Sequence, residues 1–176
     1  MTPNALRLLF LSALIVAAPP LPALPEDRDQ PIEIRADRVE IDDEAGTAVY
    51  LGAVQLDQGT LRVNAHRLTI FSENQSVTRI VAEGNDQPAR YRQVPEPDMA
   101  PIQAHARTIT YFAQDQRVEL EGRAHLRQLE DTFAGEQISY DIRERRIAAT
   151  GGPDEPVTMT IQPGRRDDRQ AAPQPE

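Results

Sequence analysis

Apolar residues recur at every second position along two long segments that contain no proline, residues 32–87 and 102–152. Leu61 and Val63 show the pattern in the first segment, as do Val49 and Leu51, and Val118 and Leu120 show it in the second. A period of two is typical of half-buried strands, and proline is excluded from the interior of a sheet because it cannot donate to the ladder. No segment has the 3.6-residue period of an amphipathic helix. The sequence therefore predicts an all-β fold.

Proline and charge mark the limits of this fold. Residues 88–101 carry several prolines and separate the two tracts, which indicates a loop between two groups of strands. The segment 163–176 is polar, charged and proline-bearing, and a composition of this kind is typical of a disordered tail. We predict one folded domain over residues 24–162, followed by a disordered C-terminal tail over 163–176.

The two tracts repeat each other. Ala36-x-x-Val39-x-Ile41 matches Ala106-x-x-Ile109-x-Tyr111 at an offset of 70 residues, and Gly52 matches Gly122 at the same offset. Within each copy the same small-x-x-apolar-x-apolar unit recurs after 29 residues, and each unit is followed by a glycine. Units that repeat in this way predict stacked β-layers in which each unit buries the apolar face of its neighbour. We expect the glycines to lie at bulges or corners of the strands.

The N-terminus predicts export. One arginine, Arg7, precedes the apolar run Leu8–Ala18, and small residues and prolines follow. These features are typical of a cleaved secretory signal peptide, which we place at residues 1–23. The alternative is an uncleaved anchor, although a membrane-spanning helix needs about 20 apolar residues. Cleavage would move the formal net charge from −9 to −10, and so acidic a chain lacks the basic face that binding to nucleic acid requires.

No residue pattern predicts catalysis, a metal site or a cofactor. His66, His105 and His125 lie far apart, without a partner at metal-ligand spacing, and we expect each to face water or a loop. The chain has no cysteine, no nucleophile elbow and no phosphate-binding glycine motif. A secreted carbohydrate-active enzyme would need two carboxylates about 5–10 Å apart. The acidic residues instead occupy predicted turns and exposed positions. An interior lined by Ile, Val and Leu fits an ordinary dry core and a slot for acyl chains equally well.

An ordered series of short motifs resembles the LptA family, the periplasmic lipopolysaccharide-transport bridge with an OstA-like domain. The resemblance covers about residues 30–150. The matching segments are Gln30-Pro31-Ile32-x-Ile34-x-x-Asp37, Leu51-Gly52-Ala53-Val54-x-x-x-Gln58-Gly59-Thr60-Leu61-x-Val63-x-Ala65, Gln87-Pro88-Ala89-x-Tyr91, His105-Ala106 through Tyr111, Leu120-x-Gly122-x-Ala124-x-Leu126 and Gly135-x-x-Ile138-x-Tyr140.

The resemblance implies an open, twisted β-jellyroll whose apolar interior holds the acyl chains of lipid A. Carried over by position, the lipid-contacting residues would be Ile32, Ile34, Tyr91, Tyr111 and Ala113; the family more typically has a larger aliphatic residue at the last position. It further implies a periplasmic location and pairing with LptC at the inner membrane and LptD at the outer membrane. A relative of either partner is an alternative identity. Residues 32–36 and 157–161 are predicted as the first and last strands, and pairing between them would build a head-to-tail homo-oligomer.

Overall fold

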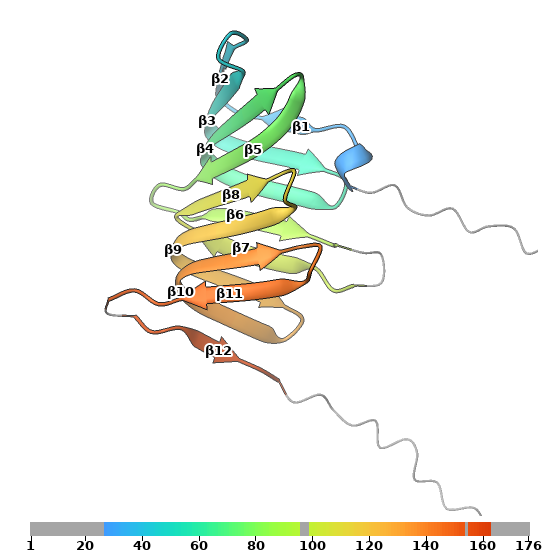
Figure 1. Ribbon diagram of the computed structural model, residues 1–176. Coiled ribbons are helices and arrows are strands. Elements are labelled where there is room, and N and C mark those ends of the chain that lie inside the picture. Colours follow the sequence, from blue (N-terminus) through green and yellow to red (C-terminus); the bar gives the residue numbers. More distant parts are fainter. Residues whose placement is uncertain (1–26, 96–98, 154, 163–176) are drawn as a thin grey trace, which may run out of the picture.

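The computed structural model describes residues 27–95, 99–153 and 155–162, so the predicted signal peptide and C-terminal tail lie outside the described residues. The described residues form one short 3-10 turn, η1 (Asp27–Asp29), and twelve strands in one antiparallel sheet (Figure 1). The strands are β1 (Glu33–Arg35), β2 (Arg38–Asp42), β3 (Thr47–Gln58), β4 (Leu61–Glu73), β5 (Ser76–Glu83), β6 (Ala89–Gln93), β7 (Ile102–Ala106), β8 (Thr108–Phe112), β9 (Arg117–Gln128), β10 (Asp131–Asp141), β11 (Arg146–Thr150) and β12 (Thr158–Thr160).

The sheet is folded into two layers because its four long strands, β3, β4, β9 and β10, each run through both. The strands of the first layer pair in the order β1, β3, β4, β6, β7, β9, β10, β12. The strands of the second layer pair in the order β2, β3, β4, β5, β8, β9, β10, β11. The long strands use one half in each layer. The result is an open, twisted β-jellyroll.

The long strands change layer at bends that lie along one side of the molecule. The β3–β4 pairing shifts register between Leu51 and Val54, and the β9–β10 pairing shifts between Gly135 and Gln137. Gly52 and Gly122 have φ of +97° and +79°, a conformation that glycine adopts without a Cβ clash. The predicted corner position of these two glycines is therefore confirmed. We call this side the vertex. On the opposite side, the mouth, each tight turn joins strands of the same layer only.

The predicted internal repeat is also confirmed. Strands β1–β6 and β7–β12 follow one another in the same order, and β3 (Thr47–Gln58) and β9 (Arg117–Gln128) have ranges that differ by the predicted offset of 70. Both copies pass between the layers in the same way. The copies join in the middle of the molecule, where β5 pairs with β8 in the second layer and β6 pairs with β7 in the first.

Side chains that face inward form continuous rows across the strands. In the first layer one row of direct cross-strand neighbours is Ile34, Leu56, Val63, Tyr91, Ala104, Leu126, Phe133 and Met159. The second layer has two such rows, Val39, Tyr50, Leu68, Ala82, Ile109, Leu120, Ile138, Ala149 and Ile41, Ala48, Ile70, Ile80, Tyr111, Val118, Tyr140, Ile147. The central members of the rows are buried and form the core.

The inward rows of side chains are exposed to solvent at both ends of the stack of strands. Among the described residues, the exposed large hydrophobic side chains gather on or beside the terminal strands, with Leu129 in a turn as the exception; they are Ile32, Val39, Ile41, Val157, Met159 and Ile161. Strands β2 and β12 lie at opposite ends of the molecule (Figure 1). Within the described part of the chain, each terminal strand pairs on one side only. An apolar interior that is buried in the middle and open at both ends is thus the main geometric feature of the fold.

Candidate functional site

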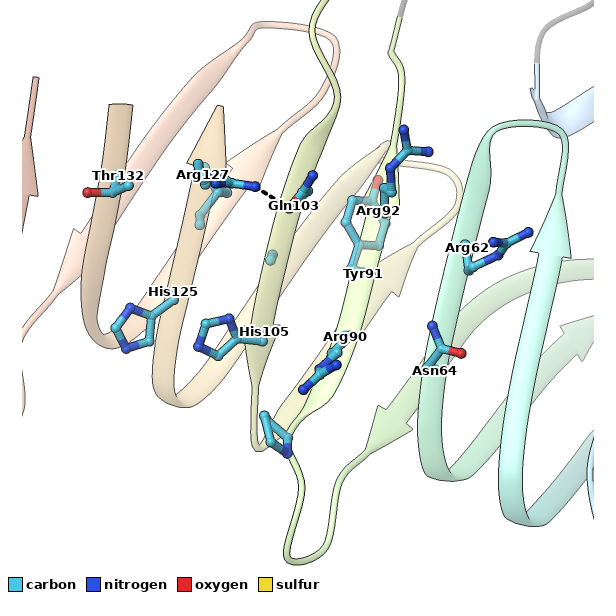
Figure 2. Close-up of a pocket in the computed structure, with 13 residues that line it drawn as sticks. Arg62, Asn64, Arg90, Tyr91, Arg92, Gln103, His105, His125, Arg127 and Thr132 are labelled. Carbon is cyan, nitrogen blue, oxygen red and sulfur yellow. Dashed lines mark hydrogen bonds between the residues drawn. The ribbon is translucent and has the colours of Figure 1, made fainter. Parts of the chain in front are cut away.

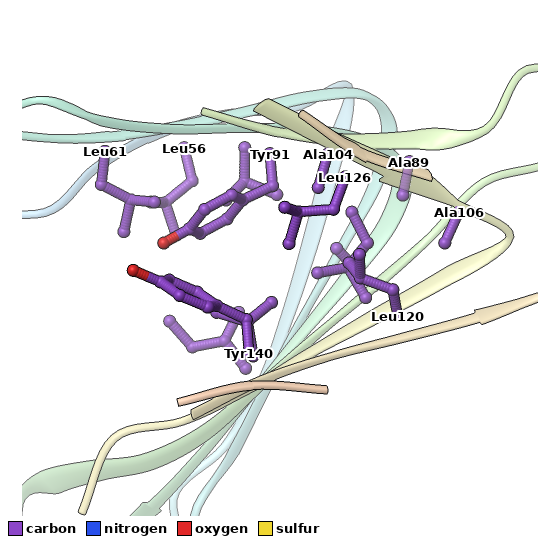
Figure 3. Close-up of a cluster of buried hydrophobic side chains, with 14 of the residues drawn as sticks. Leu56, Leu61, Ala89, Tyr91, Ala104, Ala106, Leu120, Leu126 and Tyr140 are labelled. Carbon is purple, nitrogen blue, oxygen red and sulfur yellow. The ribbon is translucent and has the colours of Figure 1, made fainter. Parts of the chain in front are cut away.

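The interior between the two layers is the candidate site. It is lined by the inward rows, whose members come from every strand and whose burial falls from the centre toward the ends. Figure 3 shows the layers converging on the side of Ala106 and Leu120 and lying apart on the side of Tyr91 and Tyr140. An apolar molecule would meet a wall of Leu, Ile and Val side chains on both sides once it had entered at the mouth.

Two tyrosines from opposite layers bring polar atoms into this wall. Tyr91 on β6 and Tyr140 on β10 are 4% and 1% exposed, and their hydroxyl groups point toward one another near the mouth (Figure 3). The hydroxyl of Tyr91 donates a hydrogen bond to Oε1 of Gln93. Burial, followed by the nearby Tyr111 and Tyr140, raises the pKa of Tyr91 well above its ordinary value of 10.0, so its hydroxyl stays protonated at neutral pH.

A small hydrogen-bond network holds the N-terminal segment against the rim of the mouth. Oδ1 of Asp27 accepts from the Thr60 amide at 2.6 Å, and its Oδ2 accepts from the Thr60 hydroxyl at 2.6 Å and from Nε2 of Gln93 at 2.9 Å. Gln93 therefore links Asp27 to the buried hydroxyl of Tyr91. Gly59, with φ of +57°, leaves room for Asp27 beside the turn between β3 and β4. The network fixes the start of the described chain at the side where the interior opens.

Three of the five residues assigned from the family resemblance belong to the interior wall. Ile34 and Tyr91 lie in the same inward row of the first layer, and Tyr111 lies in a row of the second layer. Tyr91 is buried, whereas Ile34 and Tyr111 are half-buried and pack against the core. Their contact with lipid remains a prediction.

The other two assigned residues lie at the margins. Ile32 precedes β1 and is 37% exposed at the end of the stack. Ala113 follows β8, is half-buried at the turn, and donates its amide to the carbonyl of Thr78 at 3.0 Å. Neither belongs to the core or to the apolar residues that pack against it. Their role also stays a prediction.

Several wall residues were not assigned from the sequence. Leu56, Phe133 and Met159 share the inward row of Ile34 and Tyr91, and Tyr140 faces Tyr91 from the other layer. The internal repeat offers a sequence signal for Tyr140, because this residue occupies the same apolar position of the repeated unit as Ile70, at an offset of 70 residues. Cross-strand register, which brings Met159 beside Phe133, is set by turns and bulges rather than by the alternation of the last strand itself.

Other kinds of site find little support in the described residues. His66, His105 and His125 are exposed, as predicted. Within residues 27–95, 99–153 and 155–162 no three His, Cys, Asp or Glu side chains are close enough to hold a metal ion. The same ranges contain no helix with the length and hydropathy needed to cross a membrane.

The sequence of this chain is similar to a known protein family. The family model described as LptA/(LptD N-terminal domain) LPS transport protein matches residues 33–146. The chain is 36% identical over 171 residues to the lipopolysaccharide export system protein LptH of Pseudomonas aeruginosa, covering 93% of this chain and 97% of that protein. It is 28% identical over 165 residues to the lipopolysaccharide export system protein LptA of Escherichia coli K12, covering 94% and 89%.

A solved structure has the same fold. The crystal structure of P. aeruginosa LptH, described as the LptA homologous periplasmic component of the lipopolysaccharide transport device, superposes with a TM-score of 0.73 at 35% identity. The match covers 79% of this chain and all of that one. The two-layer fold, the open apolar interior and these similarities agree, and the chain belongs to the family of LptA and LptD N-terminal-domain lipopolysaccharide transport proteins.

Proposed function

We propose that this chain is a periplasmic, non-enzymatic carrier that shields the acyl chains of lipopolysaccharide in its interior and passes the lipid from the inner toward the outer membrane. The observation that carries the proposal is the set of inward apolar rows that run the whole length of the stack and are uncovered at both ends. A closed globular core would bury the ends of these rows. A conduit has to leave them open.

Burial of the acyl chains supplies the attraction. Each buried CH₂ contributes about 0.8 kcal/mol, so even part of one chain gives a useful affinity. The central wall residues, such as Leu56 and Leu120, are packed against their neighbours and 0% exposed, so the chains enter between the half-buried side chains near the mouth. An interior open along the mouth leaves the sugars in water. This limits the affinity and allows the cargo to move along the rows.

The internal junction between the two copies supplies a template for assembly. In the middle of the molecule β5 pairs with β8 and β6 pairs with β7, and these strands correspond to β11 with β2 and β12 with β1 in the repeat. The same two pairings made between molecules would place β11 and β12 of one copy beside β2 and β1 of the next. The result is a head-to-tail filament whose interior is continuous, and it covers the exposed apolar residues of both ends.

The template also fixes the register of the contact. Ala82 pairs with Ile109 and Ile80 pairs with Tyr111 at the internal junction. The equivalent intermolecular pairs are Ala149 with Val39 and Ile147 with Ile41 of the neighbouring copy. We further propose that the same terminal strands pair with the OstA-like domains of LptC at the inner membrane and LptD at the outer membrane.

The experiment that tests the function is photo-crosslinking in cells from residue 34, with residue 143 as the control. Ile34 is half-buried in an inward row, whereas Arg143 is exposed in the turn after β10. A lipopolysaccharide adduct from position 34 and none from position 143 is the expected result. Absence of an adduct at both positions, with the chain folded and located in the periplasm, contradicts lipid transport.

A further inference from the structure

The outer surface of the first layer carries a cluster of four arginine and two histidine side chains that the interior site does not use. These side chains lie on the adjacent strands β4, β6, β7 and β9 (Figure 2), and we refer to them as the basic face: Arg62, Arg90, Arg92, His105, His125 and Arg127. All six are exposed, and they surround a shallow hollow of about 630 Å³. The whole chain has a formal net charge of −9, so this concentration of positive charge is a local feature.

The cations of the basic face are poorly neutralised. On the second layer Arg67 pairs with Glu83 at 3.5 Å and Arg117 pairs with Glu119 at 3.2 Å. On the basic face only Arg62 has such a partner among the described residues, Asp57 at 2.6 Å, and this contact is the main cause of the lowered pKa of Asp57. Arg127 donates to a neutral oxygen of Gln103 at 2.6 Å.

The pairing of the strands sets like charges against each other. Arg62 lies directly opposite Arg92, so two guanidinium groups face each other. Arg90 lies directly opposite His105, and it contributes to the lowered pKa of that histidine. His105 in turn stacks on His125 with ring centroids 4.6 Å apart. Like charges at directly opposed positions destabilise a sheet. A bound anion would relieve this repulsion.

The fold does not require cations at these positions. The repeat supplies the comparison, because the row that contains Arg62, Arg92 and Arg127 continues through Thr132 and Thr160 of the second copy and through Glu33 and Asp57 of the first. Equivalent places in the same architecture are therefore neutral or acidic. The basic character belongs to the middle of the molecule, over the centre of the proposed lipid path.

From this arrangement we propose that the basic face binds the phosphorylated sugar part of the lipopolysaccharide whose acyl chains occupy the interior. The inference rests on the proposed function. Arg62, Arg92 and Arg127 form the outward row nearest the mouth, two residues or fewer from the ends of their strands, where the headgroup emerges. Guanidinium groups bind phosphate oxygens through paired hydrogen bonds, and their long side chains can bend over the rim. The acidic chain thereby gains a local attraction for an anionic cargo.

The test compares lipid A carrying its phosphates with the same lipid A after dephosphorylation. The full mature chain and the variant Arg90→Gln/Arg92→Gln/Arg127→Gln are titrated with each lipid at low and high salt. We expect the parent to bind the phosphorylated lipid about tenfold more tightly at low salt, because exposed charge-assisted contacts are screened by salt. The variant should bind both lipids equally and should keep the affinity of the parent for the dephosphorylated lipid.

The matched control removes the same number of arginines from the second layer, as Arg67→Gln/Arg79→Gln/Arg146→Gln. This control should keep the preference of the parent. The inference is overturned if the basic-face variant still prefers phosphorylated lipid A, or if the parent has no such preference. In either case, binding of dephosphorylated lipid A would still support the carrier function. Failure of every folded protein to bind either lipid contradicts the carrier function itself. Loss by the variant of binding to phosphatidylglycerol vesicles, with the lipid A preference intact, would assign the face to a membrane surface and also overturn the inference.

Discussion

Ile34 and Met159 stand at opposite ends of one row of directly paired, inward-facing residues that crosses every strand of the first layer. Met159 is 50% exposed and Ile34 is half-buried, whereas Leu56, Tyr91 and Leu126 between them are buried. By the template of the internal junction, Met159 of one copy would lie beside Ile34 of the next. The row would then continue from molecule to molecule without a polar break.

The register of this contact can be tested with cysteines, since the chain has none of its own. We expect a Val39→Cys variant and an Ala149→Cys variant, mixed and oxidised, to form a disulfide-linked heterodimer, because directly opposed strand residues are close enough to be bridged. Ala148 faces the other side of the sheet, so an Ala148→Cys variant should cross-link far less with position 39. Equal yields from 148 and 149, read on a non-reducing gel, would refute the register.

The C-terminal edge should control self-association. Deletion of residues 157–176 removes β12 with Val157, Met159 and Ile161, all exposed, so the folded domain loses little buried surface. We expect smaller oligomers by light scattering and a nearly unchanged circular dichroism spectrum. Unchanged oligomer size would count against pairing of the terminal strands.

Lipid capture should depend on the inward rows. Ile34→Asp or Tyr111→Asp places an unpaired carboxylate on the apolar wall, and burying a charge without a partner is costly. We expect either change to abolish capture of lipopolysaccharide by the purified protein. Arg143→Ala, a change on an exposed turn, should capture lipid as the parent does. Equal capture by all three variants would mean that the lipid binds elsewhere.

The sequence predicted the all-β class, the 70-residue repeat and the corner glycines, because alternation, proline placement and glycine depend on local chemistry. It did not predict the phase of every strand. Val49 and Leu51 alternate as a half-buried strand should, yet the register places Ala48 and Tyr50 in the inward rows. The inward residues of β3 keep this phase beyond the irregular pairing, where Val54 and Leu56 are buried, so the larger apolar residues of the first half lie on the other face. A difference of one residue in phase moves every side chain to the other face of a sheet. The basic face was missed for a related reason, since its six residues meet only through cross-strand register.

Gly122 should be sensitive to any side chain. Its φ is +79°, and an added Cβ would lie 2.9 Å from the Cβ of Arg107. We expect Gly122→Ala to lower the free energy of unfolding by about 1–3 kcal/mol, the usual cost of a non-glycine residue held in this region. Gly152→Ala is the control, because an added Cβ there has its nearest contact at 3.4 Å. Urea denaturation measures both, and equal midpoints would show that the bend tolerates a side chain.

Acidification should destabilise the protein through His105. Partial burial of the ring lowers the pKa of His105 below its ordinary value of 6.5, although the residue as a whole is exposed, and the neighbouring His125 and Arg90 lower it further. A histidine whose pKa is lower in the folded state favours folding while it is neutral, and this contribution is lost as the pH falls below about 6.5 toward the folded-state value. His105→Gln should therefore flatten the fall in stability between about pH 7 and 5. The control is His66→Gln, at an exposed position outside the basic face. The urea midpoint, measured across this pH range, should fall with acidification in the parent and in the His66 variant, and should fall less in the His105 variant. Parallel pH profiles for all three proteins would contradict the assigned role of His105.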